Sequence, residues 1–139
     1  MGWIAGFYRS TVGRKIVMAV TGLILVGFVT GHMTGNLLMF ESPAAINNYS
    51  HFLQSLGGLL WAGRGVLLVS VGLHVHCAWT LSRQARAARP AGYAERVNQA
   101  STPSARAMRW GGLVLLAFIV FHILHFTTGT LHPDFVPGA

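Results

Sequence analysis

IVMAVTGLILVGFVTGHMTGNLLM, residues 16–39, is an apolar run that contains no charged side chain. An α-helix crosses the hydrocarbon core of a bilayer with roughly 20 mostly apolar residues, so this run is long enough to span it. The run is longer than the apolar part of a secretory signal, which has about 7–15 residues, and no small-x-small cleavage site follows it closely. It is therefore predicted to be a retained transmembrane helix.

Two further runs, residues 59–81 and 108–128, have the same character. Of the 139 residues, 53% are hydrophobic and only 9% are charged, whereas soluble domains carry about a quarter charged residues. This composition excludes a free-standing soluble domain and a nucleic-acid-binding module. The sequence predicts an all-α transmembrane helical bundle with three spans in a single domain, residues 1–139.

The basic residues of the loops and termini are all placed on one side of these runs. Three precede the first run, and six lie in or beside the inner loop, residues 82–107: Arg9, Arg14 and Lys15, then Arg83, Arg86, Arg89, Arg96, Arg106 and Arg109. The connection between the first two runs holds Glu41 but no Lys or Arg. Because short loops rich in Lys and Arg stay on the cytoplasmic side, the N-terminus is predicted to be cytoplasmic.

Three smaller features lie outside the spans. An apolar cluster, Trp3, Ile4 and Phe7, is typical of a segment at the membrane interface. Thr102 followed by Pro103 predicts the N-cap and first turn of the third helix. The basic inner loop, which Pro90 and Gly92 interrupt, is expected to attract anionic lipid headgroups or dock a partner protein, unless it only sets the topology.

The chain has seven histidines, and five of them fall inside the spans: His32, His74, His76, His122 and His125. Ionisable groups in a span are costly and usually face the bundle interior, where they have a partner or a function. Counting about 1.5 Å of helix rise per residue predicts an outer level with His32, His122 and His125 and an inner level with His74 and His76. His122 and His125 share a helix face, whereas His74 and His76 point to nearly opposite sides.

Haem is the group that fits histidines at one depth on different helices, because its iron takes one axial imidazole on each face of a flat ring. Zinc needs three or four ligands at one point, and no third ligand converges here. Gly31, within a Gly27, Gly31, Gly35 stripe, predicts either clearance for the macrocycle or plain helix packing. Arg64, the one charge well inside a span, either pairs with a haem propionate or quinone headgroup or extends to the interface.

Three stretches carry a family resemblance: Ser10 to Phe40, Gly72 to Tyr93 (GLHVHCAWTLSRQARAARPAGY) and Met108 to Gly129 (MRWGGLVLLAFIVFHILHFTTG). They resemble the first, second and next haem-binding spans of the di-haem cytochrome b anchor of succinate dehydrogenase and fumarate reductase. The resemblance implies a prokaryotic cytoplasmic-membrane subunit that binds a flavoprotein and an iron–sulfur subunit. Electrons would pass between the iron–sulfur clusters, two haems b and a quinone, usually menaquinone.

The resemblance also implies ligand roles. By motif position His32 and His122 match the two ligands of the distal haem, and His74 matches one ligand of the proximal haem. The depth estimate slightly favours His125 over His122 opposite His32, but the motif favours His122. A bis-imidazole haem carries electrons rather than binding oxygen, so the chain is expected to transfer electrons and react with quinone, without a dicarboxylate site of its own.

The chain departs from the family in one respect. The family has five spans, and a histidine on the fourth completes the proximal haem, whereas three spans are found here. Either the sequence is truncated, which the tail LHPDFVPGA favours because it has no stop feature, or a second polypeptide supplies the missing helices. A single haem shared between two small anchor subunits is the other arrangement known for such complexes, and it would put the pairing of His32 with His122 in doubt.

Three other hypotheses remain open at the level of sequence. The second hypothesis is a cytochrome b anchor of a different dehydrogenase, such as a hydrogenase, which co-purifying subunits would identify. A transporter or proton channel with a histidine relay predicts transport without visible absorbance. A structural scaffold would use the histidines only as hydrogen-bonded core residues.

Overall fold

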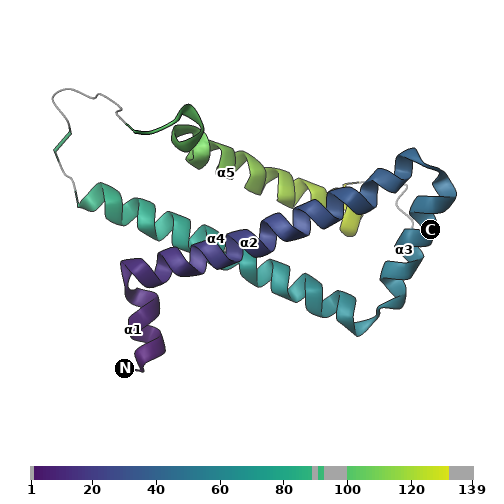
Figure 1. The fold of residues 1–139 in the computed structure, drawn as a ribbon, viewed down its shortest axis with the longest axis horizontal. Coiled ribbons are helices and arrows are strands. Elements are labelled where there is room, and N and C mark those ends of the chain that lie inside the picture. Colours follow the sequence, from purple (N-terminus) through teal and green to yellow (C-terminus); the bar gives the residue numbers. More distant parts are fainter. Residues whose placement is uncertain (1, 89–90, 93–99, 132–139) are drawn as a thin grey trace. The chain divides into compact units, whose positions relative to one another are not determined.

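A computed structural model describes residues 2–88, 91–92 and 100–131 of the chain (Figure 1). Within those residues every regular element is a helix, and no strand is found. Three helices are long and apolar enough to cross a membrane: Thr11–Phe40, Gly58–Ala87 and Pro103–Thr127. The predicted all-α class and its three apolar helices are thus confirmed. The chain divides into two compact units, Met1–Gly92 and Tyr93–Ala139, which are described separately.

The first unit opens with a short helix, α1 (Trp3–Arg9), and continues after Ser10 into α2 (Thr11–Asn36). The Ser10 hydroxyl caps α2 by accepting a hydrogen bond from the backbone amide of Gly13 at 2.9 Å. This cap places Arg14 and Lys15 inside the helix, so α2 begins five residues before the predicted span. Its C-terminal end tightens into a 3₁₀ turn, η1 (Leu37–Phe40).

The connection between the first two spans contains a helix that the sequence analysis did not predict, α3 (Pro43–Ser55). Ser42 caps it by accepting from the amide of Ala45 at 3.1 Å, and Pro43 occupies its first turn. The Ser-Pro pair was a recognisable start signal. Tyr49 of α3 lies against the end of α2, where a Cβ built on Gly35 would come within 2.5 Å of the tyrosine ring.

The next helix, α4 (Gly58–Ala87), continues six residues beyond the predicted end of its span. The extension carries Arg83 and Arg86 in the last turns of the helix. Positive side chains there are stabilised by the partial negative charge of a helix C-terminus. Arg89, Pro90, Tyr93 and Arg96 of the inner loop lie outside the described residues.

Helices α2 and α4 pack against each other and cross (Figure 1). Thr21 of α2 and Ser70 and Cys77 of α4 are the buried side chains of these two helices. Small residues let helix backbones approach closely, and helix interfaces within membranes are enriched in them. Large apolar side chains such as Leu23 and Leu68 instead point outward, as expected of helices whose surroundings are lipid.

The second unit consists of α5 (Pro103–His122) followed by η2 (Ile123–Thr127), a single π-helical turn. Thr102 caps α5 by accepting a hydrogen bond from the amide of Ala105 at 3.1 Å, and Pro103 follows at the first position. The predicted helix start is therefore confirmed. A π-helical turn is rare and is often found at a functional position.

Candidate functional site

His74 lies at the contact between α2 and α4 and is the best-positioned histidine of the first unit. Its Nδ1 atom is 3.2 Å from the hydroxyl oxygen of Thr21. The Thr21 hydroxyl is also 2.7 Å from the carbonyl oxygen of Val17 and 3.1 Å from that of Met18. Thr21 is 5% exposed, so this polar group is shielded by the two helices.

These distances assign the protons of the pair. A hydroxyl has one hydrogen to donate, and the Val17 carbonyl is its nearest acceptor. The remaining lone pair of the Thr21 oxygen then accepts from His74, which places the imidazole proton on Nδ1. A neutral imidazole protonated on Nδ1 keeps its lone pair on Nε2, the form in which histidine binds a metal. No described residue forms a hydrogen bond with Nε2 of His74.

The same surroundings fix the position of the imidazole. A Cβ built on Gly22 would lie 3.3 Å from Cε1 of His74 and 3.7 Å from its Nδ1 atom. The absence of a side chain at Gly22 therefore leaves the space that the ring edge occupies. Metal-bound histidines typically have their second nitrogen held by such an outer partner, so His74 fits the role of an axial haem ligand.

His76 has a different environment. Its ring stacks on Tyr8 of α1, with centroids 6.1 Å apart and planes 20° from parallel. His74 contacts α2 while His76 contacts α1, which is consistent with the prediction that only one of the two faces a common site.

His32 lies near the C-terminal end of α2, and its side chain is exposed. Its ring stacks on Phe28 at 5.2 Å, and the Asn36 amide nitrogen is 3.4 Å from its Nδ1 atom and 2.7 Å from its carbonyl oxygen. An amide nitrogen only donates, so in this arrangement Nδ1 accepts and Nε2 carries the proton. Holding a metal through Nε2 would require the other tautomer of His32, with the Asn36 side-chain oxygen facing Nδ1.

The heights of His32 and His74 in the first unit differ. His74 is level with Thr21, which precedes His32 along α2 by about 16 Å of helix rise. This separation is consistent with the two predicted histidine levels.

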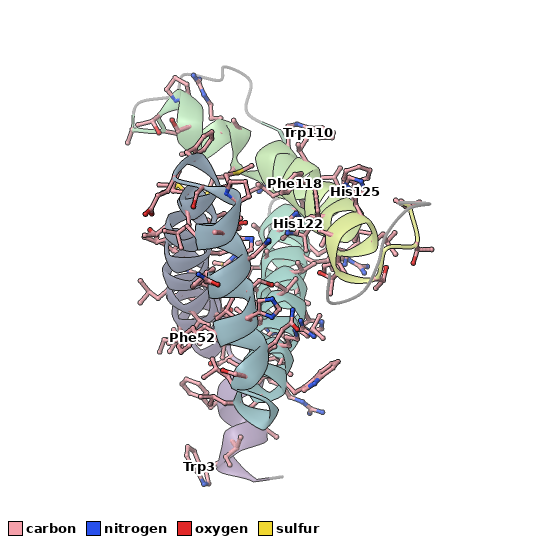
Figure 2. The ribbon with its side chains drawn as sticks, turned by 90° about the vertical axis from the view of Figure 1, so that its right-hand side faces the viewer. Trp3, Phe52, Trp110, Phe118, His122 and His125 are labelled. Carbon is pink, nitrogen blue, oxygen red and sulfur yellow. The ribbon has the colours of Figure 1, made fainter. Side chains whose placement is uncertain are left out.

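In the second unit, His122 ends α5 and His125 lies within η2 (Figure 2). His122 stacks on Phe118 at 5.6 Å, and His125 lies 5.4 Å from Phe121. The Phe126 ring contacts both imidazoles, with its centroid 5.3 Å from that of His122 and 4.3 Å from that of His125. The π-helical turn widens the spacing after His122, so the shared face predicted from α-helical geometry does not apply unchanged to this pair.

The remaining candidates have simpler surroundings. The guanidinium of Arg64 lies 4.8 Å from the ring centroid of Trp61, one turn earlier on α4, a cation–π contact that the sequence analysis did not weigh. A Cβ built at Gly31 would meet no described atom of the first unit within 4 Å, so the packing of α2 on α4 does not use this glycine. His51 is exposed on α3, and His132 lies outside the described residues.

Thr21 is the residue that sequence reasoning missed. Its signal was a lone hydroxyl side chain in an apolar run, but nothing in the run paired it with His74. Within residues 2–88, 91–92 and 100–131, no three His, Cys, Asp or Glu side chains form a group suited to a metal ion. Of the five span histidines, His32 lies on α2, His74 and His76 lie on α4, His122 ends α5 and His125 lies in η2.

Replacing Thr21 by valine tests the pair directly. The two side chains have nearly the same shape, so the variant removes the hydroxyl with little change in volume. Loss of a partner to a metal-bound histidine costs about 10- to 100-fold in metal affinity, and we expect that loss in haem affinity. Titration of the purified apoprotein with haem, followed at the Soret band, measures it. Thr30→Val is the matched control, because the Thr30 hydroxyl donates to the backbone carbonyl of Val26 within its own helix.

No protein-family model matches the chain, and neither the curated proteins nor the solved structures contain a match to it.

Proposed function

We propose that the chain is a haem b-containing membrane anchor of a succinate:quinone oxidoreductase, which passes electrons between an iron–sulfur subunit and a membrane quinone. The observation that carries the proposal is the hydrogen bond between Thr21 and His74, because it leaves the lone pair of Nε2 available inside a helix pair long enough to cross a membrane. The resemblance of the three histidine-bearing stretches to the di-haem anchor family supplies the rest.

In this proposal each residue has a defined task. His74 would hold one haem through Nε2, with Thr21 fixing the opposite edge of the imidazole. His32 and His122 would hold a second haem, and Phe28 and Phe118, which stack on their rings, would restrict rotation. Haem with two imidazoles supplies one-electron transfer without an open site for oxygen. The apolar side chains of the spans keep water away from the ligands.

The orientation and partners belong to the same proposal. The cytoplasmic end holds Arg14, Lys15, Arg83 and Arg86, as the positive-inside rule requires of a multi-pass protein of a prokaryotic cytoplasmic membrane. A flavoprotein and an iron–sulfur subunit would dock at that face. The quinone, expected to be menaquinone, would bind near one of the haems and exchange electrons with it.

The test is a reduced-minus-oxidised visible spectrum of membranes that contain the chain together with its partner subunits. We expect a sharp α-band, and a decrease of about half in each of His32→Ala and His122→Ala if two haems of equal absorbance are bound. His51→Ala, an exposed histidine in α3, is the control and should leave the band unchanged. A correctly inserted protein with no band would remove the cytochrome proposal, and co-purification with other dehydrogenase subunits would change the partner.

A further inference from the structure

The junction between α1 and α2 is a fixed elbow. The Ser10 hydroxyl donates to the carbonyl oxygen of Phe7 at 2.7 Å while it accepts from Gly13, and the Ser10 amide donates to the same carbonyl at 3.1 Å. A Cβ built on Gly13 would collide with that carbonyl. The chain therefore turns sharply at Ser10, and α1 leaves the axis of α2 (Figure 1).

Tyr8 holds α1 against the first unit. Its ring stacks on His76, and the Cys77 thiol donates to its hydroxyl over 3.9 Å. Burial raises the pKa of Tyr8 above 10.0, and the hydrogen bond with Cys77 raises it further. The phenol is therefore neutral at physiological pH and serves as an uncharged attachment of α1 to α4.

The apolar side chains of α1 are left uncovered by the rest of the unit. Trp3 is 82% exposed, Ile4 66% and Phe7 42%. Positions three and four apart share a helix face, so the three side chains form one surface (Figure 2 labels Trp3). Only Ser10 separates α1 from α2, a helix whose apolar length suits a bilayer, so α1 adjoins the end of a candidate membrane span.

Two basic residues of the elbow have no carboxylate partner in the described part of the chain. Arg14 and Lys15 lie in the first turns of α2, and the Nε atom of Arg14 is buried without a hydrogen-bond partner among the described residues. In the described part of the chain the only carboxylate side chain is Glu41, which follows the opposite end of α2. Any counter-ion for this pair must therefore come from outside the described residues.

We propose that Trp3, Ile4, Phe7, Arg14 and Lys15 form a binding surface for an anionic phospholipid of the bilayer. The three apolar side chains enter the boundary between headgroups and acyl chains, as interfacial amphipathic helices do. Arg14 and Lys15 meet the phosphate, which supplies the negative charge that the described residues lack. A lipid is favoured over a protein partner because α1 joins a transmembrane helix at the membrane surface.

The experiment uses the full chain with Trp61, Trp79 and Trp110 replaced by phenylalanine, so that Trp3 is the only tryptophan. In phosphatidylcholine nanodiscs, energy transfer from Trp3 to dansyl-phosphatidylglycerol is compared with transfer to dansyl-phosphatidylcholine. Each basic residue near an anionic surface contributes about fivefold in affinity, so we expect a preference of about 25-fold for phosphatidylglycerol. Arg14→Gln with Lys15→Gln should reduce this preference to about onefold.

Arg83→Gln with Arg86→Gln removes the same charge at the end of α4 and should keep the preference at Trp3. Lys15→Gln alone, expected to lose about fivefold, replaces the double variant if that one fails to fold. Equal transfer to both lipids in the parent protein overturns the proposal. The proposal is also overturned if aqueous iodide quenches Trp3 fluorescence as strongly as in a free peptide. It is likewise overturned if neither iodide nor brominated lipid quenches Trp3, because protein would then cover α1.

Discussion

His74→Ala is expected to produce the largest functional loss of any single substitution in the first unit. The variant removes the whole imidazole, including the Nε2 atom that the contact with Thr21 leaves available, so a haem held there would lose one axial ligand. Loss of an outer partner alone costs about 10- to 100-fold in affinity, and loss of the ligand should exceed about 100-fold. The change is measured as the amount of haem extracted from equal amounts of purified variant and wild-type protein, together with the visible spectrum of the haem that the variant retains.

His76→Ala is the matched control, because it removes the same side chain two residues away on the same helix. Its ring stacks on Tyr8 and does not contact Thr21. We expect wild-type haem content in this variant, even if α1 detaches. An equal loss in both variants would assign the effect to the folding of α4, and an unchanged haem content in His74→Ala would contradict the ligand role.

Ser70→Leu is expected to have the largest effect on the stability of the helix pair. Ser70 is 3% exposed at the contact between α2 and α4, and it shares a face with His74 and Cys77. Forcing extra carbon atoms into a close contact typically costs about 1–3 kcal/mol. That cost corresponds to roughly 5- to 150-fold more frequent separation of the helices.

The fully buried Cys77, the only cysteine in the chain, reports this separation. We expect the rate of maleimide labelling in mild detergent to rise by the same factor in Ser70→Leu. Val69→Leu is the control, since Val69 is 61% exposed and its side chain can grow without meeting α2. Labelling at the wild-type rate in Ser70→Leu would show that Ser70 is not at a close helix contact.

Sequence alone was sufficient for the number and approximate place of the apolar helices, because bilayer thickness imposes their length and composition. It was less informative about their ends. Ser10 and Ser42 start α2 and α3 through single side-chain hydrogen bonds, and such caps carry no hydropathy signal. The helix α3 was missed for a related reason, since a mixed polar segment outside the spans resembles a loop.

The face on which α2 meets α4 could not be predicted. The sequence drew attention to Gly27, Gly31 and Gly35, yet Thr21 and Gly22 make the contact with His74. Small residues occur on both faces of α2, and only the partner helix decides which face is used. The haem-ligand role of His32, His74, His122 and His125 remains a prediction. It depends on the haem itself and on the packing of helices around it, which the pattern of side chains along the sequence does not determine.

The crossing of α2 and α4 has a thermodynamic consequence. Its buried side chains, Thr21, Ser70 and Cys77, contain little hydrocarbon. The heat capacity of unfolding and its dependence on denaturant both scale with the surface that becomes exposed. The free energy of separating α2 from α4 should therefore depend only weakly on denaturant concentration, and the separation should have almost no heat-capacity change. Warming or cooling over the growth range would then leave the association of the two helices nearly constant.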